Sequence, residues 1–391
     1  MRTYLFSKLT LQPSFIYSRV TFLLGAGASY DLGYPLVREF LDQKYLYWLY
    51  DQCAAVPAGR NSPEDLLAYL LRESENFRTY SDNIEEVLSL STSTQLLHQQ
   101  VIDYIYEILS CAADMSSASR QTSSTPEHLL LASMILDLCR QGESTVITFN
   151  YDTAIEDAIS LVSSVIELEL PASYYWHYGY PEESVVSYFS DGVNCSGTQL
   201  PVAYPSGRVP ILKLHGSINT AICRSCGIIN YMPYEILSET VNNNFTGRLD
   251  DVKCKKCGAE NLEFLIVPPG KRKSIPNVLA ALWGKAKLAI EASQLVVLVG
   301  YSIPEYDFEA RSLLGSTLMN KEVLLIDPFP LDKSIRFLQE ARPSNLTVLR
   351  QRMSEFMLNE AVCYEPKLIP ILTSQCTPKY IYAERLKWYP R

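Results

Sequence analysis

Five apolar runs, each ending in a glycine or polar cluster, constrain the fold of this chain more than any other feature. The runs are rich in β-branched and aromatic residues, as buried strands are. They are Val20–Leu24, Thr145–Phe149, Val209–Leu214, Gln294–Gly300 and Val323–Ile326. Helical patterns lie between several of them, which is typical of an α/β fold with a parallel sheet. We therefore expect a Rossmann-like parallel sheet. The clusters GAGAS, FNYD, HGS, GYS and DP would lie at its carboxyl edge, where such sheets bind ligands.

The first of these clusters lies within Val20–Asp31, where a strand-like run leads into Gly25-Ala-Gly27-Ala-Ser29. Glycine after a strand allows a tight turn and a close approach to a ligand. A helix that opens there would present N–H groups to a phosphate. The pattern G-x-G-x-x-G is incomplete, because position 30 is Tyr and the next glycine is Gly33. On this stretch alone, a strand-to-helix turn without a ligand stays an open alternative.

Composition narrows the class of protein. A chain of 391 residues can form one main domain with insertions, or two domains. A net charge of −9 argues against a general electrostatic nucleic-acid binder. No apolar run is long enough for a transmembrane helix, and the first residues do not resemble a signal peptide. The cysteines favour metal ligands and free thiols in a reducing compartment, so we expect a cytoplasmic protein without membrane contact.

A helical insertion is expected over residues 36–135. Apolar residues recur there at spacings of three and four, as in amphipathic helices, and Pro63 and Pro126 suit first helical positions. The small, polar segment Cys111–Ser124 is expected to be a loop. About 100 residues is too many for a simple crossover between two parallel strands. The sheet domain would then comprise residues 1–35 and 136–330.

The rest of the chain is assigned more coarsely. A helix is expected from Thr153 to Val162, a long loop with room for a hairpin over residues 171–209, and a strand over Leu262–Pro268. Helices follow over 275–293 and 307–319. Residues 331–391 form an extension that begins with a helix and a strand and ends in an aromatic tail. We expect the tail to pack against the helical part or a neighbouring subunit.

Two C-x-x-C pairs form the most specific local signal. Cys223 and Cys226 make the first pair, Cys254 and Cys257 the second, and each pair is followed by glycine. Two such knuckles fit a tetrahedral Cys₄ zinc ribbon. A closed Cys₄ site has no open coordination position for catalysis, so we interpret the module, residues 221–262, as structural.

Three polar residues at the expected sheet edge are candidates for chemistry. His215 follows a strand, and its ordinary pKa suits a general base at neutral pH. Asn150 and Asp152 are two apart at a strand end, so both would point to one side of an extended segment. The alternatives stay open: a hydrogen-bonded core histidine, an Asx turn at Asn150 and a helix cap at Asp152.

These motifs together resemble the sirtuin family. GAGAS at 25–29, TFNYD at 148–152, LHGS at 214–217, the two C-x-x-C pairs and GYS at 300–302 occur in that family's order, over residues 20 to 330. The resemblance implies a Rossmann-type NAD-binding domain with a small zinc module. It also implies site residues. The residues implied to bind NAD are Gly25, Ala26, Gly27, Ser29, Thr148, Asn150, Asp152, Gly300, Ser302 and Asp327.

Within that resemblance, the glycine turn would face the NAD phosphates. Asn150 would hold the nicotinamide ribose, Asp152 would hold the carboxamide, and His215 would be the base. Gly300 and Ser302 would approach phosphate and ribose, with Asp327 near the adenosine half.

Departures from the protein-deacylating sirtuins point to a different acceptor. Those enzymes follow the glycine turn with a segment like GIPDFR, where this chain has LGYPLVREF. They carry Gln where Phe149 stands, and a V-x-F-G-E-like stretch where this chain has FLIVPPGKRKS. The chain is more similar to the sirtuin-like NADases of bacterial antiphage systems, although many of those lack the zinc cysteines.

The resemblance therefore implies hydrolysis of NAD⁺ to nicotinamide and ADP-ribose by Asn150, Asp152 and His215, through an oxocarbenium-like transition state. It also implies a homo-oligomer and a DNA-translocating ATPase as a possible partner. Two alternatives remain: an NAD-dependent protein-lysine deacylase, and a non-catalytic scaffold that senses NAD⁺ or ADP-ribose. No direct nucleic-acid binding is expected.

Overall fold

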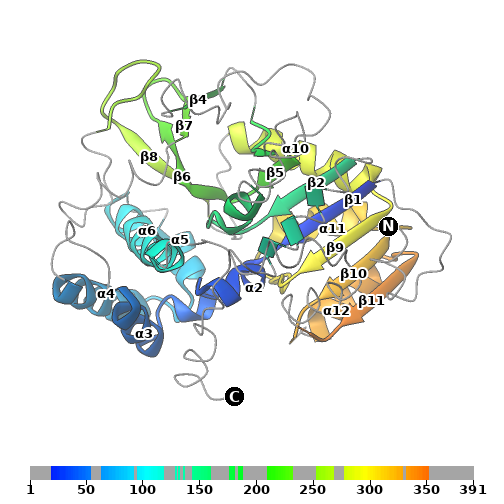
Figure 1. The fold of residues 1–391 in the computed structure, drawn as a ribbon, viewed down its shortest axis with the longest axis horizontal. Helices are drawn as coiled ribbons and strands as arrows, with labels where there is room; N and C mark the ends of the chain where they lie inside the picture. The colour runs from blue at the N-terminus through cyan, green and yellow to red at the C-terminus, as the bar shows by residue number, and fades with distance from the viewer. Residues whose placement is uncertain are drawn as a thin grey trace.

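A seven-stranded sheet dominates the computed structural model (Figure 1). The model describes residues 19–53, 63–91, 95–118, 128–129, 131–132, 135–136, 143–159, 176–180, 184–187, 209–231, 252–267, 277–328 and 332–351. The order of the strands is β11-β10-β9-β1-β2-β5-β3, and every neighbouring pair is parallel. Their bounds are β1 Arg19–Leu24, β2 Glu143–Thr148, β3 Trp176–His177, β5 Val209–Lys213, β9 Leu295–Val299, β10 Glu322–Ile326 and β11 Asn345–Leu349. The five predicted strands are adjacent in this sheet, so the expected α/β class is confirmed.

The strands end in register at one edge. Leu24 at the end of β1 pairs with Thr148 of β2 and Val299 of β9. Thr148 pairs in turn with Lys213 of β5, and Val299 with Ile326 of β10. The segments that follow these strands therefore leave the sheet side by side, as the parallel arrangement requires.

The sheet continues beyond the boundary expected at residue 330. Helix α12 (Asp332–Glu340) is followed by β11, which pairs with β10 along its whole length. The expected helix and strand are therefore confirmed. The strand extends the parallel sheet, so this part of the chain continues the sheet rather than forming a separate extension. The aromatic tail lies outside the described residues.

A second sheet of four strands has the order β4-β7-β6-β8. Its strands are β4 Val185–Ser187, β6 Gly216–Cys223, β7 Ile229–Tyr231 and β8 Leu262–Ile266. Strand β6 begins directly after His215 of the HGS cluster, and no sequence pattern anticipated it. The hairpin expected within 171–209 is wrong for the described part, because β3 pairs with β5 and β4 pairs with β7 in different sheets.

Helices lie between β1 and β2, and those from Val37 onward fall within residues 36–135, whose division as a helical insertion stays a prediction. They are the short α2 (Ala26–Ser29), the 3₁₀ turns η1 (Tyr30–Leu32) and η2 (Val37–Glu39), and the helices α3 (Gln43–Cys53), α4 (Pro63–Arg78), α5 (Ile84–Ser91) and α6 (Gln95–Ala118). The loop expected from Cys111 is wrong as far as Ala118, because α6 continues through it. Cys111 and Ala112 are buried there, and small residues remain helical when their face packs against a core.

Among the described residues, the buried apolar side chains form two hydrophobic clusters. One lies against the parallel sheet and includes α10 (Asn277–Ala292) and α11 (Phe308–Thr317). The other joins the insertion to the second sheet, where the ring of Tyr106 on α6 stacks on Phe264 of β8 with centroids 4.3 Å apart. Figure 1 accordingly shows α3 to α6 and the second sheet as groups beside the parallel sheet. Among the described helices, none has the length and hydrophobicity to cross a membrane.

Candidate functional site

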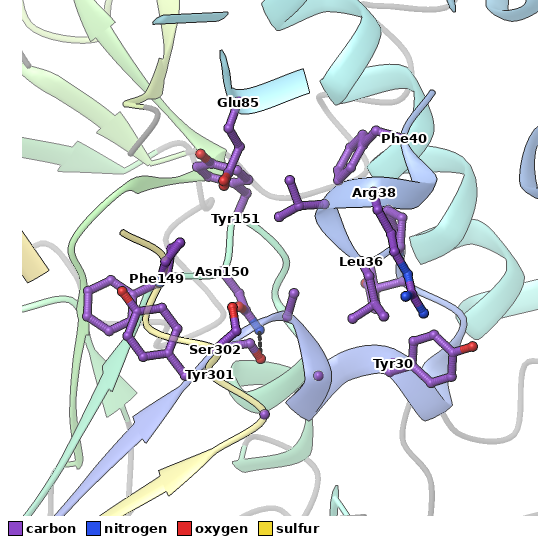
Figure 2. A pocket seen from close by; sticks show the side chains of 18 of the residues that line it. Tyr30, Leu36, Arg38, Phe40, Glu85, Phe149, Asn150, Tyr151, Tyr301 and Ser302 are labelled. Atoms are coloured by element: carbon purple, nitrogen blue, oxygen red, sulfur yellow. Dashed lines mark hydrogen bonds between the residues drawn. The ribbon is translucent and has the colours of Figure 1, made fainter. Parts of the chain in front are cut away.

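A cavity of about 540 Å³ lies where the carboxyl edge of the parallel sheet meets the insertion (Figure 2). Its walls come from the segments after β1, β2, β5, β9 and β10, and from η2, α5 and α6. The predicted residues that line it are Gly25, Ala26, Gly27, Asn150, Asp152, His215, Gly300, Ser302 and Asp327. Ser29 and Thr148 line a small second cavity together with Asn150 and Asp152. One edge of the fold thus brings together residues that are far apart in the sequence.

Three glycines at this edge are required by contact between two backbones. A Cβ on Gly300 would lie 2.4 Å from the backbone nitrogen of Ala28, and Gly300 also has a φ of +57°. A Cβ on Gly27 would lie 2.8 Å from the Cα of Gly300, and a Cβ on Gly25 would lie 2.6 Å from the carbonyl oxygen of Gly300. The turn after β1 and the loop after β9 therefore pack against each other without side chains between them.

The N–H groups of the same turn are used within the protein. Gly25 donates to the carbonyl of Val299, and Gly27 donates to that of Gly300, both at 3.0 Å. Helix α2 has only four residues. For these two glycines, the contribution to a bound phosphate would be close approach rather than hydrogen bonding. Their predicted role in binding NAD stays a prediction.

Asn150 links two strand ends. Its side-chain nitrogen donates to the carbonyl oxygen of Gly25 at 2.9 Å and to the hydroxyl of Ser29 at 3.2 Å. Its backbone N–H donates to the hydroxyl of Thr148 at 3.0 Å. Thr148 and Ser29 therefore contact Asn150 from behind the large cavity, which explains why they do not line it.

Asp152 caps the helix over 154–159, and its carboxylate accepts from the backbone N–H of Ala154 at 3.0 Å. Beneath it, the ammonium of Lys213 donates to the carbonyl oxygen of Asp152 and lies 2.9 Å from the carboxylate of Glu156. Burial raises the pKa of Asp152, against the opposing effects of Lys213 and the Ala154 N–H. The side chain can thus hold a proton at a higher pH than an exposed aspartate, which lets it serve as a donor or an acceptor.

Aromatic rings surround His215. The ring centroids of Phe149 and Trp283 lie 5.3 and 6.2 Å from that of the imidazole. Phe149 stacks on Tyr301 with centroids 4.2 Å apart and planes 14° apart. Figure 2 shows these two rings side by side. Phe149 stands where the deacylating sirtuins carry Gln, and here it packs between the histidine and the loop after β9.

One carboxylate lies against the histidine. Nε2 of His215 is 3.4 Å from Oδ2 of Asp307, and both side chains are at most 2% exposed. Asp307 precedes α11 and caps it, accepting from the N–H of Ala310 at 3.3 Å. Asp307 was missed as a site residue at the level of sequence. The sequence did offer one signal for it: an aspartate at the start of a helix, shortly after the GYS cluster.

The insertion closes the cavity on the side of Tyr151. The hydroxyl of Tyr306 donates to the carboxylate of Glu85 on α5 at 2.9 Å, and Asn83 contacts the same hydroxyl at 3.4 Å. Figure 2 shows Glu85 directed toward Tyr151, which is 8% exposed. The hydroxyl of Tyr151 has no hydrogen-bond partner among the described residues. None of these contributions was foreseen, because they depend on how the helices dock.

Arg38 of η2 supplies a positive charge at the cavity, and it too was missed. The carboxylates there are more numerous: Asp82, Glu85, Asp152, Asp307 and Asp327. Figure 2 shows the guanidinium near Tyr30, across the cavity from Phe149. Arg38 lies in the segment that differs from the sirtuin pattern, so the resemblance in sequence gave it no role.

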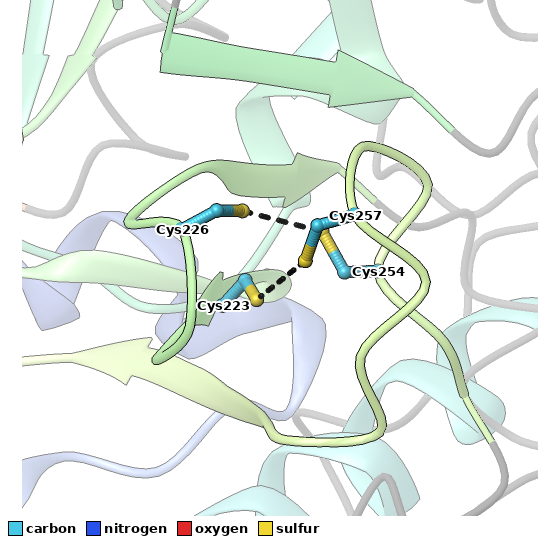
Figure 3. A group of neighbouring side chains, drawn as sticks. All are labelled: Cys223, Cys226, Cys254 and Cys257. Atoms are coloured by element: carbon cyan, nitrogen blue, oxygen red, sulfur yellow. Dashed lines mark hydrogen bonds between the residues drawn. The ribbon is translucent and has the colours of Figure 1, made fainter.

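The four predicted metal ligands form one cluster (Figure 3). All four sulfurs lie within 4.8 Å of one another, with Sγ–Sγ distances of 3.6 Å from Cys223 to Cys257 and 3.7 Å from Cys226 to Cys254. Zinc–sulfur bonds of about 2.3 Å in a tetrahedron place sulfurs about 3.8 Å apart, whereas a disulfide needs about 2.05 Å. The cluster therefore fits a zinc ion.

The surroundings of Cys254 favour its thiolate, whereas burial raises the pKa of Cys223 and of Cys226. Burial would raise the pKa of Cys254, but the backbone N–H groups of Cys257 and Lys256 and the amide of Asn230 outweigh it and lower that pKa to about 6. Gly227 and Gly258 follow the two C-x-x-C pairs with φ of +70° and +75°, which closes each knuckle. A deprotonated sulfur is the form that binds zinc.

The comparisons with known proteins concern the fold. No model of a known protein family and no curated protein sequence matches the chain. Among solved structures, it is similar to one described under the mechanism and regulation of Sir2 enzymes, at 14% identity and a TM-score of 0.43 over 96% of this chain and 99% of that chain. A structure on sirtuin substrate affinity has 14% identity and a TM-score of 0.46 over 92% and 98%.

A third similar structure is a complex of a Sir2 homologue with NAD, at 14% identity and a TM-score of 0.44 over 89% of this chain and 91% of that chain. All three are described as Sir2 or sirtuin proteins, so these structural neighbours belong to that family.

Proposed function

We propose that the chain is an NAD⁺ hydrolase that cleaves the nicotinamide–ribose bond. One observation carries the proposal: the side chains of Asn150, Asp152 and His215 line the same cavity as the glycine turn after β1. An amide, a carboxyl group and an imidazole at the carboxyl edge of the sheet can supply hydrogen bonds and base catalysis in a buried site. A cavity of about 540 Å³ is within the range of small-molecule and cofactor sites.

The reaction is a displacement at the ribose C1′. The bond to the nicotinamide nitrogen breaks, and its electron pair neutralises the pyridinium ring, which leaves as nicotinamide. The oxygen of a water bonds to C1′, and His215 accepts the proton, either from that water or from a ribose hydroxyl. Positive charge develops on the ribose on the way, as in glycoside hydrolysis generally. The products are nicotinamide, ADP-ribose and a proton.

Each residue has a role in this proposal. Asn150 holds the ribose, and Asp152 holds the carboxamide, for which a raised pKa is useful because either protonation state can form a hydrogen bond. The guanidinium of Arg38 neutralises the pyrophosphate, since the N–H groups of Gly25 and Gly27 are used within the protein.

Water is favoured as the acceptor because helices of the insertion form a wall of the cavity. Ile84 and Glu85 of α5 line it, as do Ile105 and Leu109 of α6. Glu85 is bonded to Tyr306 of the loop after β9, which ties this wall to the sheet. A peptide acceptor would have to enter past it.

Unrestrained hydrolysis would drain a cell of NAD⁺. We therefore propose a regulated, NAD-depleting effector of antiphage defence, controlled by homo-oligomerisation or by a partner such as an ATPase. Support for this role comes from the resemblance in sequence to the sirtuin-like NADases.

Purified protein with NAD⁺, with and without an acetylated peptide, tests the proposal. Nicotinamide release without peptide is the expected result. Release that depends on peptide would support deacylation instead, and binding without turnover would support a sensor. His215→Ala should lower the turnover by about 10²- to 10⁴-fold while NAD⁺ still binds. A variant that no longer binds NAD⁺ would make His215 a binding or packing residue.

A further inference from the structure

We propose that Asp307 is a positioning residue for His215: it holds the imidazole in one orientation and stabilises its protonated form. The inference deepens the function proposed above, on which its kinetic test rests. It starts from the 3.4 Å distance between Nε2 of His215 and Oδ2 of Asp307, two groups at most 2% exposed. A buried carboxylate beside an imidazole favours the charged ring, because little water screens the pair.

The carboxylate is fixed by contacts from its own segment. One oxygen accepts from the backbone N–H of Ala310 at 3.3 Å, as the cap of α11. The other, the one that faces His215, also accepts from the hydroxyl of Tyr301 at 3.1 Å. Asp307 therefore has little freedom to rotate away from the histidine.

The contacts close into a ring around the imidazole. Tyr301 stacks on Phe149, and Phe149 lies against His215. The ring of contacts thus runs from His215 to Asp307, Tyr301, Phe149 and back to His215. The aromatic rings restrict where the imidazole can lie, and the carboxylate restricts how it turns, which is the preorganisation a general base needs.

Other groups around the cavity would act on the same imidazole. The titratable and charged residues that line the cavity are Tyr30 and Tyr34 after β1, Arg38 of η2, Asp82 before α5, Glu85 on α5, Tyr151 and Asp152 after β2, Tyr301, Tyr306 and Asp307 after β9, and Asp327 after β10. Among these, Asp307 is the carboxylate at ion-pair distance from His215. A substitution that removes its charge and keeps its shape isolates its effect.

Asp307→Asn is that substitution. Asparagine caps helices as well as aspartate does, so α11 should stay intact while the charge is lost. The control is Glu305→Gln on the same loop, which removes an exposed carboxylate paired with Lys333 at 3.3 Å. Tyr301→Phe is a second variant that keeps the stacking and removes only the hydroxyl bonded to Asp307.

The first measurement is the pH profile of nicotinamide release. In Asp307→Asn we expect the plateau of kcat/KM to fall at least about tenfold, less than the about 10²- to 10⁴-fold expected from removing the base itself. We also expect the acid limb to move to lower pH, because the histidine then loses its proton more readily. Tyr301→Phe should change both in the same direction but by less, and Glu305→Gln should change neither.

The second measurement does not need activity. In the full chain labelled at histidine, NMR follows the protonation of His215, whose signal is assigned by its loss in His215→Gln. We expect Asp307→Asn to lower the midpoint of that titration by roughly one pH unit or more. An unchanged midpoint would overturn the proposal, as would a shifted midpoint with unchanged nicotinamide release. If the wild type releases no nicotinamide, the proposed function fails and the NMR titration alone decides the role of Asp307. If Asp307→Asn does not fold, Tyr301→Phe decides in its place by the same two measurements.

Discussion

Asn150 donates a side-chain hydrogen bond to the carbonyl oxygen of Gly25 at 2.9 Å, which ties the end of β2 to the turn after β1. A second hydrogen bond, to the hydroxyl of Ser29, strengthens the same tie. Asn150, which we propose to bind the ribose, therefore also stabilises the turn that forms part of the cavity wall. Its contributions to catalysis and to stability have to be measured together.

Asn150→Ala should lower both. Loss of one positioned polar group costs about 10²- to 10³-fold in turnover. Loss of the side-chain hydrogen bond should cost about 1 kcal/mol of stability, because the carbonyl of Gly25 still accepts from the backbone N–H of Ala28 at 2.8 Å. Melting temperature and nicotinamide release are measured on the same preparation. The control is Ser293→Ala, which removes a buried hydroxyl bonded to Ala289 at 2.7 Å just before β9. It should lower stability and keep turnover. If Asn150→Ala behaves like this control, Asn150 has no part in the chemistry.

Gly300→Ala should destabilise the protein by at least about 2 kcal/mol. The new Cβ would meet the backbone of Ala28 at 2.4 Å, and a φ of +57° costs a non-glycine residue about 1–2 kcal/mol in addition. Gly284→Ala is the matched control, since that glycine is on α10 and its Cβ would meet nothing within 4 Å. There the helix should gain about 0.5–1 kcal/mol. Thermal unfolding compares the two, and equal melting temperatures would rule out the close backbone contact.

The strands at the sheet edge could be predicted because each apolar run is short, β-rich and ends in a distinct cluster. The pattern identifies each strand and the residues at its carboxyl end. Because parallel strands end at the same edge of the sheet, it predicts that Asn150 and His215 lie at one edge. The Cys₄ cluster could be predicted because its spacing alone constrains it. These features depend on local sequence.

The remaining features depend on contacts between distant segments. The side chain of Lys213 on β5 is entirely buried, and an ion pair at 2.9 Å with Glu156, on the helix after β2, compensates its charge. The pattern of residues in a strand does not predict such a pair. Asp307 reaches His215 because the loop after β9 packs beside the end of β5. The burial of Cys111 and Ala112 also favours helix where the sequence suggested a loop, and α6 continues to Ala118.

Cys254→Ser should lower zinc content and unfold the small module. Structural zinc binding contributes on the order of 10 kcal/mol in zinc-finger peptides, and in this larger chain the loss should be confined to the residues around the cluster. Cys111→Ser is the control, since that buried cysteine lies on α6 away from the cluster. Metal analysis and thermal unfolding are the measurements. A soluble, zinc-free Cys254→Ser protein with unchanged melting would contradict a structural role.

His128 should make the protein less stable in acid. Burial lowers the pKa of its imidazole to about 4, against an ordinary value of 6.5, although a backbone hydrogen bond at Ala28 acts in the opposite direction. Above pH 6.5, the histidine is neutral in both the folded and the unfolded chain. Between pH 6.5 and 4, the unfolded chain binds a proton that the folded chain does not, so the free energy of unfolding falls with pH by about 3 kcal/mol in total.

His128→Gln removes this titration and keeps a side chain able to donate a hydrogen bond. We expect the stability of the variant to fall less than that of the wild type between pH 6.5 and 4, with equal slopes above pH 7. The comparison is His98→Gln: burial also lowers the pKa of His98, but that side chain is only partly buried, so the change should be smaller. Urea unfolding at several pH values measures both. His128 lines the small cavity behind Asn150 and Asp152, so its protonation places a charge beside the residues that support the site. Parallel acid slopes in the wild type and His128→Gln would show that the imidazole is protonated in the folded protein.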